Sequence, residues 1–128
     1  MAWLLDTSVA IHLRDGDAAV TDRVAALDGA VLMSIVTRVE LEGGVYREPA
    51  HAAVRRARLD TMLAAIPALA FDDAAADAYG RLVAHADYSR RKLLDRMIAA
   101  QSLVRRATLV TLNEDHFRDI PELQVEAW

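Results

Sequence analysis

Short apolar runs that end at polar residues recur along this chain, and they predict the strands of a parallel sheet. A strand that is buried on both faces is apolar throughout, whereas a half-exposed strand alternates apolar and polar residues. The first run, Trp3-Leu4-Leu5, stops at the polar residues Asp6-Thr7-Ser8. On this pattern we expect strands at residues 3–5, 30–33, 67–71 and 108–112, with an edge strand at residues 123–125.

Apolar residues at helical spacing separate these runs, so the chain alternates strands with helices. Val20, Val24 and Leu27 lie on one helical face, and Pro49 suits the first turn of a later helix. We expect helices at about residues 8–14, 18–28, 38–42, 49–65, 73–86 and 93–106, the third of them ending at Gly43-Gly44. Strands that alternate with helices predict a three-layer α/β/α sandwich with a central, mainly parallel sheet of four to five strands. We expect a single domain over residues 1–128.

The composition favours a globular protein with a packed core. Apolar residues make up 54% of the 128 residues and cysteine is absent, so we expect no disulfides and no thiolate zinc site. The chain has no signal peptide and no apolar run near the ~20 residues that span a membrane, so we expect a cytoplasmic protein. The formal net charge of -4 argues against a passive binder of nucleic acid. A carboxylate site that holds cations would reverse the charge locally.

Asp6 is the first candidate for chemistry because it directly follows a buried strand. In parallel α/β sheets the functional crevice lies beyond the carboxyl ends of the strands, and Asp6 and Asn113 both follow strand ends. Asp6 has an alternative role as the N-cap of the next helix. Thr7 or Ser8 can serve as that cap instead, which leaves the Asp6 carboxylate free for a cation or a substrate.

Glu40 and Asp95 are two further carboxylates that we expect near the same crevice, on two different helices. Each has a structural alternative: Thr37 and Glu40 have the spacing of a capping box, and Asp95 in a first helical turn interacts favourably with the helix dipole. Three carboxylates on three elements suit a hard divalent cation such as Mg2+, which takes oxygen ligands. The chemistry typical of such a site is metal-assisted phosphodiester hydrolysis.

Other motifs that carry chemistry are absent from the sequence or lack an essential residue. A phosphatase of the haloacid dehalogenase type needs a second Asp where this chain has Ser8, and a receiver domain needs a lysine beyond a late strand. The four histidines lack the spacing of a zinc site. A basic run surrounds Asp95, and in it Arg91, Lys92 and Arg96 either form a solvated face or contact RNA phosphates.

Four short motifs, in order along the chain, resemble the PIN domain, and within it the VapC-type toxins of bacterial toxin–antitoxin pairs. They are Leu4-Leu5-Asp6-Thr7-Ser8-Val9, Thr37 with Glu40-Leu41, Asp95-Arg96-Met97-Ile98-Ala99-Ala100-Gln101, and Leu109-Val110-Thr111-Leu112-Asn113 with Phe117 after it. The tail, with Ile120-Pro121 and Gln124-Val125-Glu126-Ala127-Trp128, also resembles that of many members. The resemblance covers the whole chain.

The resemblance implies a PIN-like sandwich and an endoribonuclease that depends on Mg2+ or Mn2+. It also implies a homodimer and a cognate VapB-type antitoxin that occupies the active site. Asp6, Glu40 and Asp95 fall on the family's acidic positions, which are catalytic and bind the metal. The residues that would orient these carboxylates are Thr7, Thr111 and Asn113.

The fourth acidic position is where this chain departs from the family. Relatives carry Asp at the place of Asn113, or an acid directly before the phenylalanine, where this chain has His116. Three possibilities stay open: Asp115 is the fourth catalytic acid, Asn113 contributes through water, or the fourth ligand is missing. The last of these supports an alternative function, a catalytically degenerate PIN domain that binds protein or RNA without cleaving it.

Overall fold

The computed structural model describes all 128 residues and contains one five-stranded sheet and six α-helices. The strand order is β3-β2-β1-β4-β5 and every neighbouring pair is parallel, which confirms the expected fold class. The strands are β1 (Ala2–Leu5), β2 (Ala30–Ser34), β3 (Ala68–Leu69), β4 (Thr108–Thr111) and β5 (Val125–Ala127). The helices are α1 (Thr7–Arg14), α2 (Ala18–Ala25), α3 (Ile35–Tyr46), α4 (Ala52–Ala65), α5 (Asp73–His85) and α6 (Leu93–Arg105). Short 3-10 turns lie at Pro49–His51, Arg90–Lys92 and Glu114–His116.

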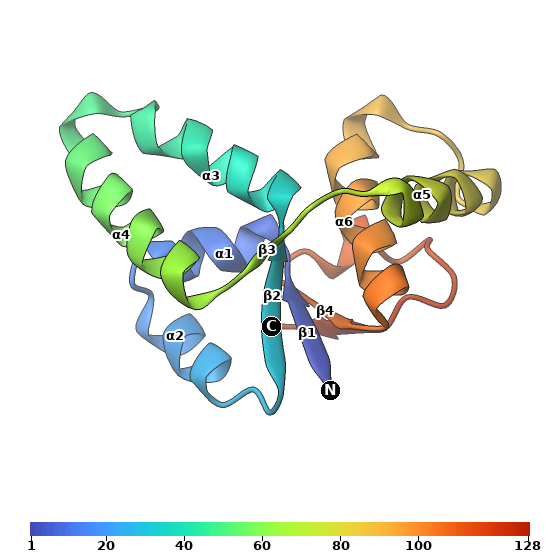
Figure 1. Cartoon of the computed structure of the whole chain (residues 1–128), viewed down its shortest axis with the longest axis horizontal. Helices are drawn as coiled ribbons and strands as arrows, with labels where there is room; N and C mark the ends of the chain where they lie inside the picture. Colours follow the sequence, from blue (N-terminus) through green and yellow to red (C-terminus); the bar gives the residue numbers. More distant parts are fainter.

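Two groups of helices cover the two faces of the sheet and make it a three-layer sandwich. Helices α1 to α4 lie on one side and α5 with α6 on the other (Figure 1). Leu4 and Leu5 of β1 are both fully buried because successive side chains of a strand point to opposite faces. Leu5 belongs to the core under α1 to α4, whereas Leu4 belongs to the core under α5 and α6. Cover on both faces explains why the strands are apolar without alternation.

Helix α3 starts earlier and ends later than the sequence pattern predicted. Ser34 caps it, since its Oγ accepts a hydrogen bond from the Val36 backbone N–H at 2.9 Å. The alternative interpretation of Thr37 and Glu40 as a capping box is therefore wrong, and both residues lie inside the helix, where a spacing of three places them on one face. The helix also continues through the glycines at 43 and 44 to Tyr46, because packing against α4 outweighs the low helix propensity of glycine.

Ion pairs join α3 to α4 and hold the helix that carries Glu40. Arg56 of α4 contacts Glu42 of α3 at 2.5 Å and Asp60 of its own helix at 2.7 Å. The hydrogen bond from Arg56 lowers the pKa of Glu42 below its usual value. The two helices form an arm that projects from the sheet (Figure 1).

The remaining differences from the sequence pattern concern the ends of elements. Helix α2 ends at Ala25 rather than at residue 28, and β5 lies at Val125–Ala127 rather than at residues 123–125. Pairing with β4, which sets Leu109 opposite Val125, decides the position of this edge strand. No helix of the structure combines the length and the apolar composition that crossing a bilayer requires.

Candidate active site

The carboxyl edge of the sheet holds the three carboxylates that the sequence pattern indicated. Asp6 follows β1, Glu40 lies in α3, and Asp95 lies in the first turn of α6. Burial raises the pKa values of Asp6 and Glu40, and repulsion from the Asp95 charge raises both further. Residues that are far apart in the sequence therefore form one electrostatically coupled group.

Asp6 is buried, with 3% of its surface exposed, and its two oxygens have different partners. Oδ1 accepts hydrogen bonds from the Val9 backbone N–H at 3.0 Å and from the Ser8 hydroxyl at 2.5 Å, while Thr111 Oγ1 donates to Oδ2. Asp6 is thus the N-cap of α1, and the prediction that Thr7 or Ser8 serves as the cap is wrong. Capping engages only Oδ1, so it does not exclude a role for Asp6 in the crevice.

Ser8 and Thr111 also connect Asp6 to the segment that follows β4. The Ser8 hydroxyl accepts a hydrogen bond from the Leu112 backbone N–H at 3.1 Å, and Thr111 Oγ1 accepts one from the Asn113 N–H at 2.9 Å. Each hydroxyl therefore acts as both donor and acceptor, which fixes its orientation. The Asp6 carboxylate is held both by the first turn of α1 and by the end of β4, as a rigid functional group requires.

Thr7, one of the residues expected to orient the carboxylates, contacts Glu40. Thr7 Oγ1 donates a hydrogen bond to Glu40 Oε1 at 2.7 Å and lies 3.0 Å from the Thr37 hydroxyl. Burial raises the pKa of Glu40, the Thr7 hydrogen bond opposes this rise, and the charges of Asp95 and Asp6 add to it. A cation bound between these carboxylates would relieve their mutual repulsion.

His116 contacts Asp95 from the 3-10 turn that follows β4. Its Nδ1 lies 3.0 Å from Asp95 Oδ2, and the two side chains are 54% and 31% exposed. No basic partner for Asp95 is evident from the sequence, because the two residues are 21 positions apart. The contact ties the first turn of α6 to the end of β4.

Asp115 does not join the three carboxylates. Its side chain is 79% exposed and pairs with Arg118 at 2.6 Å. Asn113 contributes its backbone N–H to Thr111, whereas its side chain makes no hydrogen bond. His116 is therefore the side chain of this segment that reaches the carboxylate group.

The basic residues expected to contact RNA differ in solvent exposure. Arg91 is exposed, and Lys92 is partly exposed with its Nζ 3.7 Å from Asp119 Oδ2. Arg96 is only 2% exposed, and its Nη2 donates to Asp119 Oδ2 at 2.9 Å. The Arg96 guanidinium thus faces protein rather than solvent, and two of its nitrogens, Nε and Nη1, have no hydrogen-bond partner.

The donor set at the carboxyl edge fits a hard divalent cation, although the side chains do not form a closed cage. No three His, Cys, Asp or Glu side chains of the structure lie close enough together to hold a metal ion by themselves. Mg2+ keeps several waters and is usually bound through one or two carboxylates with substrate phosphates. Carboxylates that repel one another, as Asp6 and Glu40 repel Asp95, suit such an open site.

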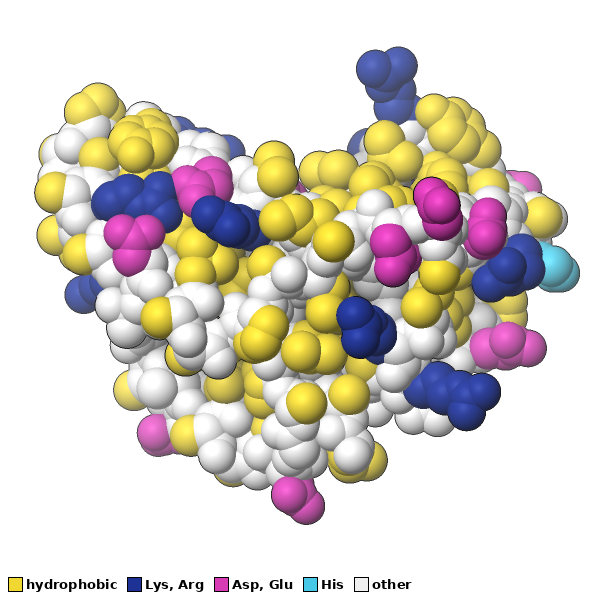
Figure 2. Space-filling model, viewed as in Figure 1, with side chains coloured by type: hydrophobic (Ala, Val, Ile, Leu, Met, Phe, Trp, Pro, Cys, Tyr) yellow, Lys and Arg dark blue, Asp and Glu magenta, His cyan; other side chains and the backbone are white.

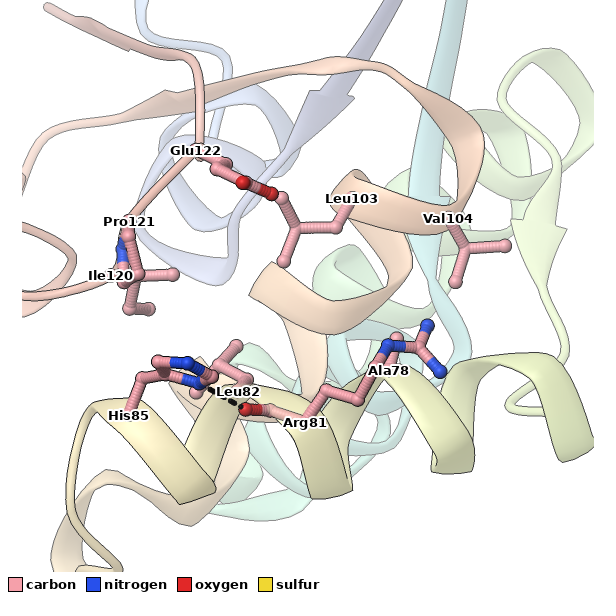
Figure 3. Close-up of a pocket in the computed structure, with 9 residues that line it drawn as sticks. All are labelled: Ala78, Arg81, Leu82, His85, Leu103, Val104, Ile120, Pro121 and Glu122. Atoms are coloured by element: carbon pink, nitrogen blue, oxygen red, sulfur yellow. Dashed lines mark hydrogen bonds between the residues drawn. The ribbon is translucent and has the colours of Figure 1, made fainter.

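A well-formed cavity lies apart from these carboxylates. It has a volume of about 430 Å³ and lies between α5, the carboxyl-terminal half of α6 and residues 120–122 (Figure 3). Its polar lining consists of Arg81, His85 and Glu122, and His85 Nδ1 is bonded to the Arg81 carbonyl. Leu103 of α6 is about 12 Å along the helix from Asp95. None of Asp6, Glu40 and Asp95 lines this cavity.

The surface between the α3–α4 arm and helices α5 and α6 is hollowed and largely apolar. Figure 2 shows hydrophobic side chains gathered in the notch between the α3–α4 arm and the α5–α6 side. Val39 of α3 and Leu94 of α6 are 65% and 44% exposed. Apolar side chains that gather in one hollow mark a surface suited to contact with another macromolecule.

Three residues at the site were not assigned these contacts from the sequence. Ser8 holds Asp6, Thr37 contacts Thr7, and His116 contacts Asp95. Helical spacing could have identified Thr37, which is three residues before Glu40. No local signal identifies the contact of His116, which depends on how β4 and α6 are placed.

Comparison with known proteins identifies the family. The chain matches the PIN domain over residues 3–123. It is similar to VapBC-5 from Mycobacterium tuberculosis, a member of the VapBC family of toxin–antitoxin systems, at 30% identity and a TM-score of 0.72, over 98% of this chain and 96% of that one. Among curated proteins no significant match was found.

Two further solved structures share the fold. VapBC2 from Rickettsia felis, bound to a promoter DNA fragment, is 23% identical with a TM-score of 0.89, over 100% of this chain and 99% of that one. DNA-bound VapBC from Salmonella typhimurium is 22% identical with a TM-score of 0.87, over 100% and 98%. The family match covers most of the chain and the parallel sheet agrees with it, so the chain belongs to the PIN-domain family.

Proposed function

We propose that this chain is the toxin of a VapBC-type toxin–antitoxin pair and acts as an endoribonuclease that depends on Mg2+ or Mn2+. The observation that carries the proposal is the coupled group of Asp6, Glu40 and Asp95 at the carboxyl edge of the sheet. The similarity to VapBC-5 supports the toxin role. Both favour hydrolysis of RNA phosphodiester bonds as the reaction.

Asp6, Glu40 and Asp95 would hold the cation in this proposal. When bound, the cation would activate water and stabilise negative charge on the phosphate oxygens. Thr7 keeps Glu40 aimed at the crevice, and Thr111 does the same for Oδ2 of Asp6. Loss of residues that orient ligands typically weakens metal affinity or activity by about 10-fold to 100-fold.

Two residues considered from the sequence are not part of the proposed machinery. Asp115 is exposed and paired with Arg118, so we assign it no catalytic role. Arg96 is buried against Asp119, so we assign it no contact with RNA. Arg91 and Lys92, which solvent reaches, remain the proposed contacts with RNA phosphates.

The proposed partners are a VapB-type antitoxin and a second copy of this chain. The crevice is acidic, so we expect an antitoxin to enter it with an arginine, whose guanidinium binds a carboxylate through two hydrogen bonds. The exposed side chains of Val39 and Leu94 offer apolar surface to these partners. Replacing the arginine in the antitoxin should abolish inhibition, and unchanged inhibition would contradict this mode of binding.

The decisive experiment measures cleavage of RNA by the purified chain, free of antitoxin, with Mg2+, with Mn2+ and with a chelator. We expect cleavage only with metal and its loss in Asp6→Asn. Asp17→Asn is the matched control, because Asp17 caps α2 through a 3.0 Å hydrogen bond from Val20 N–H just as Asp6 caps α1. A parent protein that cleaves no RNA and binds no Mn2+ would instead favour the degenerate, binding-only PIN domain.

A further inference from the structure

A second hollow is connected to the carboxylate site through His116 and has no place in the proposed reaction. It has a volume of about 380 Å³, within the range of ligand pockets, and lies at the carboxyl ends of β4 and β5. Its lining consists of Leu112, Asn113, Glu114, Asp115, His116, Ala127 and Trp128. His116 lines this hollow, and its Nδ1 also lies 3.0 Å from Asp95 Oδ2. The His116 side chain therefore lies between a ligand in the hollow and the Asp95 carboxylate.

The indole of Trp128 is a fixed aromatic surface at this hollow. The Trp128 backbone N–H donates to the Thr111 carbonyl at 2.9 Å, which anchors the residue to β4. The ring packs against the core under α1 to α4, and the Arg23 guanidinium carbon lies 5.6 Å from the ring centroid. Trp128 nevertheless stays partly exposed and lines the hollow. An aromatic ring held in this way can stack on a planar ligand with little loss of side-chain entropy.

The polar rim of the hollow offers hydrogen-bond acceptors. Glu114 and Asn113 are exposed, and their side chains make no hydrogen bond or ion pair in the structure. Asp115 is engaged by Arg118. The rim therefore suits a ligand that presents amino donors in the plane of its ring, and it does not suit an isolated phosphate.

We propose that this hollow binds one unpaired base of the RNA strand, stacked on Trp128, with its amino edge donating to Glu114 and Asn113. This inference rests on the proposed ribonuclease function and adds a specificity site to it. Recognition of single-stranded RNA commonly combines stacking on aromatic side chains with hydrogen bonds to base edges. A carboxylate only accepts hydrogen bonds, and the amino group of adenine, cytosine or guanine has two N–H donors for Glu114 and Asn113, whereas uracil has only N3–H, so the amino-bearing bases are favoured over uracil.

A basic side chain of a protein partner is the competing occupant, and the ring itself argues against it. Arg23 already lies against Trp128, so a second cation on that ring would be repelled. An uncharged base meets no such repulsion.

The test measures binding without cleavage, in an Asp6→Asn background with Mg2+ present. Trp3→Phe removes the other tryptophan, whose Nε1 donates to the Asp28 carbonyl at 3.0 Å, so that fluorescence reports Trp128 alone. The probes are single-stranded hexamers of adenylate, cytidylate or uridylate, with an abasic hexamer as control. We expect quenching by adenylate and cytidylate, less by uridylate, and none by the abasic hexamer. Equal quenching by the abasic hexamer overturns the proposal.

Variants then test the two parts of the site through the affinity for labelled hexamers. Trp128→Ala should weaken binding of adenylate on the order of tenfold, and Trp128→Phe should keep most of the affinity. Glu114→Gln, at an exposed position, should reduce the preference for adenylate over uridylate. The inference is contradicted if Trp128→Ala binds adenylate with unchanged affinity. It is also contradicted if Glu114→Gln keeps the full preference for adenylate over uridylate. If Trp128→Ala fails to fold, the quenching experiment and Glu114→Gln decide it.

These experiments distinguish failure of the proposed base site from failure of the proposed ribonuclease function. Cleavage of RNA by the parent chain combined with unchanged hexamer binding in Trp128→Ala would refute the base site and leave the ribonuclease intact. Trp128-dependent hexamer binding by a chain that cleaves no RNA would refute the ribonuclease and keep the base site. A loss of antitoxin affinity in Trp128→Ala, with RNA affinity unchanged, would assign the hollow to the protein partner and overturn the inference.

Discussion

Asp6→Asn removes the negative charge at the base of the crevice while it keeps the shape of the side chain. Asparagine caps helices as well as aspartate does, so its Oδ1 can still accept the hydrogen bond that the Val9 N–H donates at 3.0 Å. The new amide nitrogen faces Thr111 Oγ1, a hydroxyl with two lone pairs. The variant therefore separates the effect of the charge from the effect of the cap.

The raised pKa of Asp6 determines whether Asp6→Asn stabilises or destabilises the native state. Burial raises this pKa, so the native state holds the proton more tightly than the unfolded chain does. The protonated group stabilises the native state below the pKa of the unfolded chain, and this stabilisation is lost as the pH rises through the interval up to the native pKa. Above the native pKa this stabilisation is lost, and the charge is then a net cost that asparagine does not carry.

The size of this cost follows from the partners of the carboxylate. Burying a carboxylate costs several kcal/mol, and each hydrogen bond to a charged group returns about 1.5–3 kcal/mol. The bonds from Val9, Ser8 and Thr111 therefore offset most of the cost. We expect Asp6→Asn to raise the free energy of unfolding by about 1 kcal/mol at neutral pH, and the melting temperature by about 4 °C.

Urea and thermal unfolding at neutral pH and at about pH 4 test this expectation, with Asp17→Asn as the matched control. The gain in Asp6→Asn should shrink at the lower pH, and Asp17→Asn should be near neutral at both. Mg2+ at about 100 times its Kd should add about 2.7 kcal/mol to the parent alone, which reverses the order of stability. An Asp6→Asn protein that is less stable than its metal-free parent at neutral pH would refute the reasoning.

Three further predictions concern the surroundings of the site. Thr7→Val removes the hydroxyl that donates to Glu40, and calorimetry should show Mn2+ affinity reduced by about tenfold; unchanged affinity would mean that Thr7 does not orient the ligand. Asp119→Ala leaves the buried Arg96 guanidinium without an anion and should cost about 3 kcal/mol in urea unfolding, whereas Arg96→Met should cost under about 1 kcal/mol; equal costs would contradict this asymmetry. Leu59→Ala, at a fully buried position of α4, should cost about 3 kcal/mol by the same assay, and a cost below about 1 kcal/mol would show that the core there relaxes.

The alternation of strands and helices was predictable because local pattern and tertiary burial agree. Strands β1, β2 and β4 are covered on both faces, so their apolar runs are visible in the sequence without any knowledge of their neighbours. The helix caps were less predictable. Asp6, Thr7 and Ser8 all carry side chains that can cap, and the choice depends on the segment that follows β4, because the Ser8 hydroxyl accepts a hydrogen bond from the Leu112 N–H. Ser34, rather than Thr37, caps α3 for a similar reason, since Thr37 is buried against Thr7.

The sequence by itself determined which elements form, and it marked Asp6, Glu40 and Asp95 as carboxylates near strand ends and helix starts. Only the tertiary structure decided that their charges are coupled and that His116, not Asp115, reaches the group. The contacts that decide this join residues between 21 and 105 positions apart. Electrostatic energies and hydrogen bonds depend on distances of a few ångströms, and such distances between remote segments are set by how helices pack on the sheet, which no local pattern specifies.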